Sequence, residues 1–227
     1  MSTTQHDIEP LVAGDKLTFE EFERRWEATP DIKRAELIGG VVYIMSPLTW
    51  SHGTKDFDLS NWLGIYTAQT PGTQGAHAPT VRMFDDGPQP DVAAIIKPEC
   101  GGRSHMLGKY VSGAIEFAGE VSHSSSAYDL HQKKDLYHAA GVQEYVTVLL
   151  REQEVRWHVW QPAAYGLLTP AADGVVRSQV FPGLWLDPVA FMKGDMKRVL
   201  DVLNQGIESR EHGEFVAQLA ARMGSSR

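Results

Sequence analysis

The chain has 227 residues, a length that fits one domain with a substantial hydrophobic core. Its formal net charge of -8 at pH 7 argues against a protein that binds DNA nonspecifically through a largely basic surface. A local basic cleft is still compatible with this net charge. The single cysteine, Cys100, excludes an internal disulfide and a cysteine-based zinc site, and it suits a reducing cytoplasm.

The first residues have neither a basic start nor an apolar core, so we expect no signal peptide. No apolar run approaches the roughly 20 residues that span a bilayer. We therefore expect a cytoplasmic protein that does not enter a membrane. We expect a loose lead-in over residues 1–16, one domain over 17–205, and a C-terminal tail over 206–227 that could form a short helix.

The first predicted helix covers residues 18–28, with Thr18 placed to cap its start. Its apolar stripe repeats at helical spacing and consists of Phe19, Phe22 and Trp26. Residues 35–45 then carry two short, largely apolar runs on either side of Gly39 and Gly40. This pattern predicts a two-stranded ribbon that turns at the glycine pair.

A second helix is expected over residues 51–68. Its predicted buried side consists of Phe57, Leu59, Trp62, Leu63 and Tyr66. Strands are expected at 75–84 and 91–96, joined by a turn at 85–88. The polar, glycine-rich residues 97–109 favour an exposed loop.

The pattern of the central stretch, residues 115–148, predicts a strand, a helix and a second strand. Glu120 lies near the end of the first strand, and the hydroxyls of residues 124–126 can cap the helix that follows. Gly141 stands where that helix needs a left-handed stop, and 145–148 is a short β-branched run typical of a buried strand. We expect the α/β fold to be organised around this unit.

The sequence signals for the remaining helices and strands are weaker. Residues 154–160 alternate as a half-buried strand that pairs with the one before it. Asp187 and Pro188 predict the start of a helix over 188–203, and residues 214–223 predict a last, marginal helix. Exposed strands after Glu154 offer edges to pair, so we expect a homodimer.

The candidate chemistry rests on acidic side chains and one lysine. Each has an ordinary explanation: Asp91 follows Pro90 as in many turns, Glu120 at a strand end is usually solvated, and Asp129 with Lys133 fits an exposed i,i+4 ion pair. Together they suggest a metal site, because hard divalent ions such as Mg²⁺ prefer oxygen ligands. Such an ion would make crowded carboxylates tolerable and could activate water against a phosphodiester.

Several motifs occur in a characteristic order. They are Glu36-Leu37-Ile38-Gly39-Gly40, Met45-Ser46-Pro47 with His52, Pro90-Asp91-Val92, Glu120-Val121-Ser122, Asp129 through Lys133 to Tyr137, Gly141-Val142-Gln143-Glu144-Tyr145 and Phe181-Pro182-Gly183-Leu184. The ordered set resembles the Uma-two family of restriction-endonuclease-like proteins over about Leu17 to Leu186. That family belongs to the PD-(D/E)XK nuclease superfamily.

The resemblance implies a restriction-endonuclease-like α/β core, a central mixed sheet flanked by helices, here with an added antiparallel β extension and a C-terminal helix. It makes Asp91, Glu120 and the Val121 carbonyl the ligands of Mg²⁺ or Mn²⁺. It also makes Glu36 an acid that completes the site and Lys133 the catalytic lysine. Further substrate contacts would come from residues near these positions: His52, Ser122, Asp129 and Tyr137.

One departure from the superfamily concerns the lysine. Its simplest motif places a lysine two positions after the glutamate, where this chain has Ser122. The resemblance moves the lysine to the helix at Lys133, and the adjacent Lys134 stays an alternative. Ala118 and Gly119 are also smaller than usual for this strand, which indicates that another group packs close to its backbone.

The leading hypothesis is an Mg²⁺-dependent endonuclease that hydrolyses DNA phosphodiester bonds with metal-activated water. The alternative is a module that keeps the nuclease fold, has lost catalysis, and acts in binding or regulation as a homo-oligomer. The acidic net charge and Ser122 favour this alternative. The sequence leaves open whether the nucleic acid is DNA or RNA.

Overall fold

The computed structural model describes residues 8–45, 47–123 and 128–225, without the side chains of 128–130 and 225. The helices are α1 (Phe19–Glu27), α2 (Trp50–Ala68), α3 (Tyr128–Ala140), α4 (Pro188–Lys193), α5 (Met196–Ile207) and α6 (Arg210–Ser225), with a 3₁₀ turn η1 (Pro98–Cys100). The longer strands are β1 (Ala35–Ile38), β2 (Val41–Ile44), β3 (Thr73–His77), β5 (Val92–Ile96), β8 (Phe117–Ser122), β9 (Glu144–Leu149) and β10 (Glu154–Val159). The shorter strands are β4 (Val81–Arg82), β6 (His105–Leu107), β7 (Tyr110–Ser112), β11 (Gly166–Leu168), β12 (Val176–Arg177) and β13 (Trp185–Leu186).

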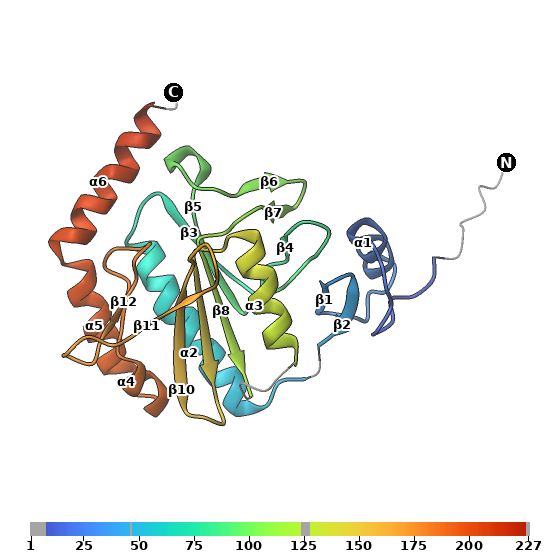
Figure 1. The fold of residues 1–227 in the computed structure, drawn as a ribbon, viewed down its shortest axis with the longest axis horizontal. Helices are drawn as coiled ribbons and strands as arrows, with labels where there is room; N and C mark the ends of the chain where they lie inside the picture. Colours follow the sequence, from blue (N-terminus) through green and yellow to red (C-terminus); the bar gives the residue numbers. More distant parts are fainter. Residues whose placement is uncertain (1–7, 46, 124–127, 226–227) are drawn as a thin grey trace.

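A six-stranded mixed sheet forms the centre of the fold, in the order β11-β10-β9-β8-β5-β3 (Figure 1). Strands β8 and β9 are parallel, and the other neighbours in this sheet are antiparallel. Two parallel neighbours need a crossover, and α3 supplies it. The predicted strand–helix–strand unit is therefore confirmed.

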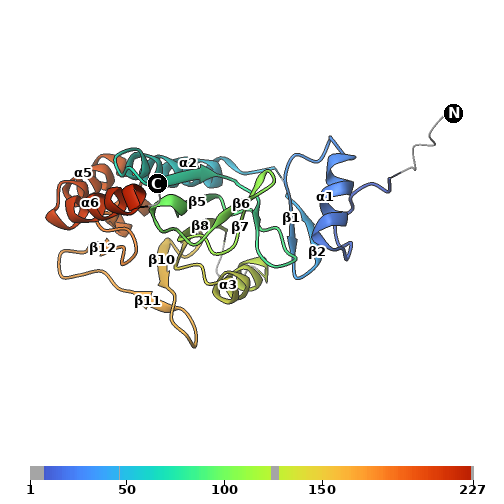
Figure 2. The ribbon, with the colours of Figure 1, turned by 90° about the horizontal axis from the view of Figure 1, so that it is seen from above.

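Helices cover both faces of this sheet (Figure 2). Helix α2, with α5 and α6 beside it, lies on one face, and α3 lies on the other. The larger hydrophobic cluster fills the α2 side and includes Trp62, Phe117 and Trp157. A smaller cluster on the α3 side includes Ala118 and Tyr137. Because successive strand residues face opposite sides, Phe117 and Ala118 of β8 enter different clusters.

The N-terminal part packs at one end of the sheet as helix α1 on the β1–β2 ribbon (Figure 1). The Thr18 side chain caps α1 by accepting a hydrogen bond from the Glu21 amide. The ribbon turns at Gly39 and Gly40, both of which have positive φ, as expected. Mutual backbone hydrogen bonds between Leu37 and Gly87 attach the ribbon to the chain that leads into β5.

Two expectations about the helices were wrong. Residues 188–203 form two helices, because Gly194 adopts a φ of 75° that ends α4 and Asp195 caps a new start for α5. On α2, Phe57 is 65% exposed, whereas the other four residues of the predicted buried side are buried. The buried side of α2 also includes Asp56 and Asp58.

The residues between α2 and β8 are more structured than the sequence suggested. The expected strand over 75–84 is divided into β3 and β4, which belong to different sheets. Residues 97–109, expected to be an exposed loop, contain η1 and β6, and both Cys100 and Ser104 are buried.

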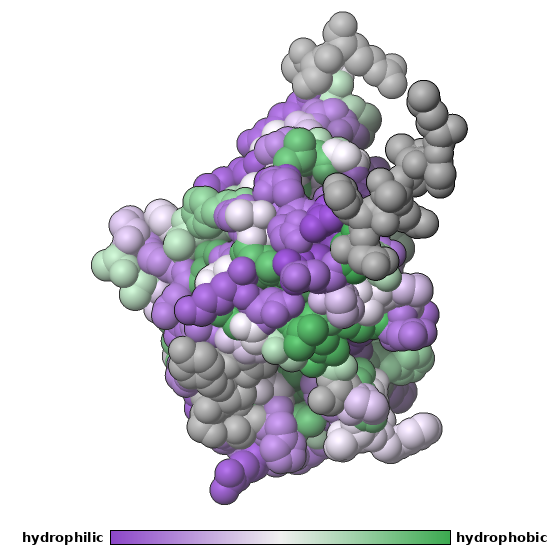
Figure 3. Space-filling view, turned by 90° about the vertical axis from the view of Figure 1, so that its right-hand side faces the viewer, coloured by the Kyte–Doolittle hydropathy of each residue, from purple (hydrophilic) through white to green (hydrophobic). Residues whose placement is uncertain are grey.

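Helix α6 is longer than the helix predicted over 214–223. Its Leu219 is fully buried and belongs to the larger hydrophobic cluster. The predicted caps at residues 124–126 lie outside the described residues. In the described ranges, no helix is long and apolar enough to cross a membrane. On the face that carries α1, hydrophobic residues form separate patches among hydrophilic ones (Figure 3).

Candidate active site

Asp91 and Glu120 lie beside each other on neighbouring strands. The antiparallel register of β5 and β8 pairs Val92 with Gly119, which places Asp91, one residue before β5, opposite Glu120. Residues that face each other across an antiparallel pair project to the same side of the sheet. Both side chains are buried, with exposures of 4% and 6%. The fold therefore brings these two predicted site residues together.

The backbone of Val121 also faces this point. Its amide donates a hydrogen bond of 2.8 Å to Asp91 Oδ2. In a strand, the N–H and C=O of one residue point toward the same neighbouring strand. The Val121 carbonyl therefore lies on the side of β8 that faces Asp91, which suits its predicted role as a metal ligand.

Lys133 of helix α3 reaches across the α3 side of the sheet to two carboxylates. Its Nζ lies 2.7 Å from Glu36 Oε1 and 3.0 Å from Glu120 Oε1. Both Lys133 and Glu36 are buried, and Glu36 also accepts a hydrogen bond from the Gln89 amide at 2.6 Å. The ribbon, strand β8 and helix α3 therefore meet through one ammonium group.

Tyr137 completes the surroundings of Glu120. One helical turn after Lys133, its hydroxyl donates a hydrogen bond of 2.8 Å to Glu120 Oε1. Burial, followed by the nearby charge of Glu120, raises the pKa of the Tyr137 phenol well above its ordinary value. The phenol is therefore a protonated donor that orients the carboxylate.

The charges in this cluster are not balanced by the protein alone. Burial raises the pKa of the Glu120 carboxyl to about 8; Lys133 opposes this shift, whereas the Asp91 and Glu36 carboxylates reinforce it. Burial also disfavours the charge of Lys133, but Glu120 and Glu36 outweigh it and raise the lysine pKa. Lys133 is thus a cation at neutral pH, while Glu120 is poised between its neutral and ionised forms.

Arg34 is a member of the cluster that the sequence reasoning missed. Its Nη2 lies 3.3 Å from Asp91 Oδ1. Arg34 precedes β1 and is two residues from Glu36, a spacing that places both side chains on one face of an extended chain. Alternation of Arg34 with Glu36 was the signal that could have identified it.

His52, at the start of α2, approaches the same carboxylate. Its Nε2 is 3.9 Å from Asp91 Oδ2, which is too long for a hydrogen bond. Two buried nitrogen atoms near Asp91, His52 Nε2 and Arg34 Nε, have no hydrogen-bond partner among the described residues. Unpartnered nitrogen atoms beside a carboxylate indicate a place where a water molecule or a substrate would be held.

The remaining predicted residues fall in different places. Ser122 is the half-buried last residue of β8, two positions beyond Glu120. The backbone of Asp129 belongs to α3, and its side chain lies outside the described residues. Lys134 turns away from the carboxylates, since its Nζ lies 3.3 Å from His158 Nε2. The geometry therefore favours Lys133 over Lys134 as the lysine of the site.

The residues present suit a hard divalent cation. Within the described part of the chain, no group of three or more His, Cys, Asp or Glu side chains is arranged to hold a metal. Mg²⁺, however, commonly takes only one or two protein carboxylates and completes its shell with water and substrate oxygens. Asp91, Glu120 and the Val121 carbonyl supply ligands of this type. Burial, reinforced by the charges of Asp91 and Glu36, raises the pKa of Glu120, and a bound cation would oppose that shift.

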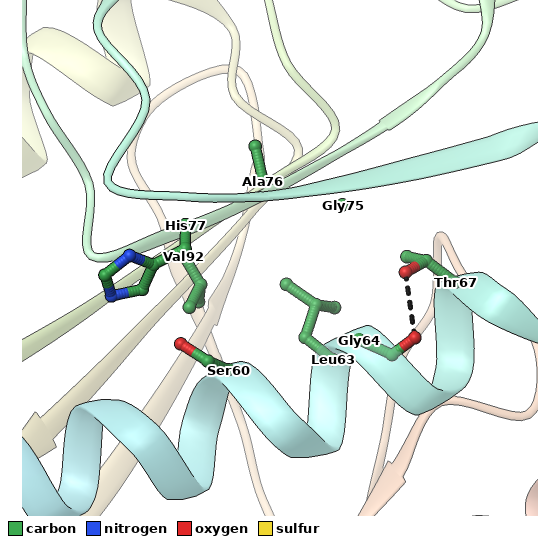
Figure 4. Close-up of a pocket in the computed structure, with 8 residues that line it drawn as sticks. All are labelled: Ser60, Leu63, Gly64, Thr67, Gly75, Ala76, His77 and Val92. Carbon is green, nitrogen blue, oxygen red and sulfur yellow. Dashed lines mark hydrogen bonds between the residues drawn. The ribbon is translucent and has the colours of Figure 1, made fainter.

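A separate cavity lies on the opposite face of the sheet, between α2 and the edge strand β3 (Figure 4). Its volume is about 220 Å³, and its wall includes Ser60, Leu63 and Val92. The Thr67 hydroxyl at its rim is hydrogen-bonded to the Gly64 carbonyl. This cavity contains none of the predicted acids and is not part of the candidate site.

Comparison with solved structures gives a related fold. A crystal structure titled as a putative nuclease from Anabaena variabilis superposes with a TM-score of 0.60 at 15% sequence identity. The match covers 78% of this chain and 99% of that one. At this identity the likeness establishes the fold, which is that of a nuclease-like α/β protein. No curated protein matches the sequence.

Comparison with protein families identifies the family of this chain. The model of the Uma2 family, described as "Putative restriction endonuclease", matches residues 19–189. This range contains the ribbon, both β5 and β8, and helix α3, and so all of the residues that meet at Lys133. The chain therefore belongs to the Uma2 family of restriction-endonuclease-like proteins.

Proposed function

We propose that this protein is a metal-dependent endonuclease that hydrolyses the phosphodiester bonds of DNA. The observation that carries the proposal is the meeting of Asp91, just before β5, with Glu120 near the end of β8 and Lys133 in the middle of α3. Mg²⁺ or Mn²⁺ would be held by the two carboxylates and the Val121 carbonyl. Bound there, such an ion would polarise the phosphate and lower the pKa of a coordinated water.

The protein's own groups have distinct tasks in this proposal. Lys133 offers an ammonium that can orient a water molecule or stabilise negative charge on a phosphate oxygen. To do so it must share its donors with Glu36 and Glu120, which now hold it at 2.7 and 3.0 Å. Tyr137 fixes the Glu120 carboxylate through its 2.8 Å hydrogen bond.

Arg34 and His52 act on the other carboxylate. Arg34 holds Asp91 Oδ1 at 3.3 Å, and this contact keeps the second oxygen aligned with the Val121 amide. The unpartnered His52 Nε2 lies 3.9 Å from the other oxygen, Asp91 Oδ2, and can donate to, or accept from, a substrate phosphate or water. His52 is therefore a proposed substrate contact beside Asp91.

A second candidate function is binding or regulation without catalysis. The specific observation in its favour is Ser122, which occupies the position where the simplest nuclease motif has a lysine. Lys133 supplies an ammonium from α3 instead, already paired with two buried carboxylates. Calorimetric titration with Mn²⁺ separates the two functions, because no heat of binding would favour the module without catalysis.

The direct assay is cleavage of supercoiled plasmid in Mg²⁺ or Mn²⁺, followed by excess chelator. We expect metal-dependent conversion to nicked and linear DNA, and at least a 100-fold slower rate for Glu120→Ala. The matched control is Glu116→Gln, a buried acid four residues earlier whose carboxylate accepts backbone hydrogen bonds from Ile96 and Arg103. Cleavage that is independent of metal, or unchanged in Glu120→Ala, would reject the proposal.

We further propose that the protein is a homodimer. The six-stranded sheet ends at β3 on one side and at the short β11 on the other. The edge strand β3 exposes four of its five residues, and an open edge of this kind can pair with a second copy. Sedimentation equilibrium tests this: a molecular mass near 25.2 kDa at micromolar concentration would contradict it.

A further inference from the structure

A groove opens beside the candidate site, between the start of α2 and the ends of β9 and α4. Its volume is about 540 Å³, within the range of ligand sites in proteins. The residues of its wall that matter here are Trp50, Lys55, His123, Arg151 and Lys193. We call it the cationic groove.

Two elements contribute to both the groove and the candidate site. On α2, Ser51 lines the groove while the adjacent His52 approaches Asp91. On β8, the strand that carries Glu120 continues into His123, which lines the groove. Along β8, His123 of the groove is three residues after the proposed metal ligand Glu120. Along α2, Ser51 of the groove is adjacent to the proposed substrate contact His52.

Within the described part of the chain, the groove is lined by the cations Lys55, Arg151 and Lys193 and by no Asp or Glu, although the whole chain has a formal charge of -8. Arg151 and Lys193 are exposed there. Lys55 is held in place by Asp58, 3.3 Å away, and by the Phe191 carbonyl at 2.5 Å. Local positive charge on an acidic protein indicates a binding partner with negative charge.

Nearby acids do not cancel this charge. Asp58 is paired with Lys55 and is buried. Glu152, in the turn between β9 and β10, and Glu154, the first residue of β10, both act on Arg156, whose pKa is raised chiefly by its hydrogen bond with Glu154. The charges of Arg151 and Lys193 therefore remain available to an anionic ligand.

Trp50 adds a flat aromatic surface to the groove. It is the first residue of α2 and is 91% exposed. The Thr49 side chain caps the helix at this point through the His52 amide, so the backbone that carries Trp50 is fixed. An exposed indole beside cations is the combination with which proteins bind unpaired nucleic-acid strands, by stacking on bases and by pairing with phosphates.

We propose that the cationic groove binds a single-stranded segment of nucleic acid, with Trp50 stacked on one unpaired base and Arg151 and Lys193 on adjacent phosphates. The inference rests on the proposed function, because it names the substrate of that same site. Bases within a duplex are already stacked on each other and offer no free face to an indole at the surface. The proposed cleavage would therefore occur in single strands or in unpaired segments of duplexes.

Fluorescence anisotropy with a labelled 12-nucleotide strand tests this in chelator, so that binding is measured without cleavage. We expect the single strand to bind at least 10-fold more tightly than a duplex of equal length. Trp50→Ala should weaken single-strand binding roughly 5- to 150-fold, the usual effect of losing one stacked base. Phe57→Ala is the matched control, because Phe57 is a 65% exposed aromatic on the same helix that does not line the groove.

Salt dependence separates stacking from charge pairing. In single strands, each neutralised phosphate contributes about -0.7 to the slope of log K against log salt. The double variant Arg151→Ala, Lys193→Ala should therefore reduce the slope by about 1.4, whereas Trp50→Ala should leave it unchanged. The control pair is Lys197→Ala with Arg210→Ala, two cations whose side chains are 85% and 89% exposed on α5 and α6.

Several results would overturn the inference. Equal affinities for the single strand and the duplex would exclude recognition of unpaired bases, and equal affinities of Trp50→Ala and Phe57→Ala would exclude stacking by Trp50. Self-association that is lost in Trp50→Ala, with no oligonucleotide binding, would assign the exposed indole to a contact between copies. All of these binding experiments are carried out in chelator. A failure of the metal-dependent plasmid assay would therefore not change their outcome, and the two proposals can fail independently.

Discussion

Lys133 Nζ lies 3.0 and 3.1 Å from the two carboxylate oxygens of Glu120, and both residues are buried. The contact joins helix α3 to strand β8 at the point where the simplest nuclease motif would have its lysine on the strand. Ser122, which occupies that strand position, has no ammonium group. Helix α3 instead supplies the ammonium of Lys133 to the Glu120 carboxylate.

Replacing Lys133 by methionine should destabilise the protein by about 3–5 kcal/mol, because it leaves two buried carboxylates without their cation. The free energy of unfolding in urea measures this. The matched control is Lys134→Met, whose ammonium contacts His158 rather than an acid and whose loss should cost less than about 1 kcal/mol. Equal stability of the two variants would contradict the described role of Lys133.

Stability should depend on pH through Glu120. Its pKa in the folded protein is about 8, above the ordinary value of 4.5, so the folded state binds more protons than the unfolded state between these pH values. The stabilisation is complete below about pH 4.5 and is lost as the pH rises toward 8. In chelator, the free energy of unfolding of the wild type should therefore fall relative to Glu120→Gln, by up to about 1.4 kcal/mol per pH unit.

Other shifted groups do not disturb that comparison. Burial lowers the pKa of His158 to about 4, and burial raises that of Glu144 to about 7, but both groups are present in the wild type and in the variant. Their effects cancel in the difference between the two proteins. Parallel pH profiles of the wild type and Glu120→Gln between pH 5 and 8 would show that Glu120 is ionised in the folded, metal-free protein.

Metal binding should release protons. A cation requires the ionised carboxylate, and Glu120 is partly protonated at neutral pH when no cation is bound. Mn²⁺ titrations at pH 7 in buffers of different ionisation enthalpy should give close to one proton released per ion. Glu120→Gln should bind Mn²⁺ at least 10-fold more weakly, and the residual binding should release no proton from this position.

Gly119 should tolerate no side chain. A Cβ at Gly119 would lie 2.6 Å from Val92 Cγ2 and 3.2 Å from Leu59 Cδ2, so Gly119→Ala should destabilise the protein by about 1–3 kcal/mol. The control is Gly64→Ala on α2, where nothing lies within 4 Å and alanine should stabilise the helix by about 0.5–1 kcal/mol. Thermal unfolding of both variants distinguishes close packing at β8 from a general intolerance of substitution.

That close approach was predictable from the small residues of the strand, although its partners were not. The sequence showed that Ala118 and Gly119 lacked bulk. Only the antiparallel register of β5 against β8 brings Val92 to this position. Local signals such as the Thr18 cap and the positive φ of Gly141 were likewise predictable, because each depends on a few adjacent residues.

The convergence of the candidate site could not be read from spacing. Asp91 and Glu120 meet through β5–β8 pairing, and Glu36 reaches Lys133 only because the ribbon is attached through Leu37 and Gly87. Their proximity was predicted from the family resemblance, because the resemblance implies a fold, whereas no single residue or spacing does. Arg34 was missed because no motif includes it, although its alternation with Glu36 was visible.

The errors in the helices have a common cause. An apolar period continues through Gly194, so the pattern predicted one helix where glycine and the Asp195 cap divide it into two. Phe57 fits the apolar period of α2, yet it faces solvent while the neighbouring Asp56 and Asp58 are buried. Periodicity identifies an amphipathic helix, but contacts with the rest of the fold decide which face is covered.

A shared divalent cation at Asp91 and Glu120 is tested most directly by crystals soaked in Mn²⁺ and measured for anomalous scattering. We predict one strong peak about 2.0–2.3 Å from an oxygen of each carboxylate and from the Val121 carbonyl. A peak at other residues, or no peak at a Mn²⁺ concentration that supports plasmid cleavage, would contradict the proposed site.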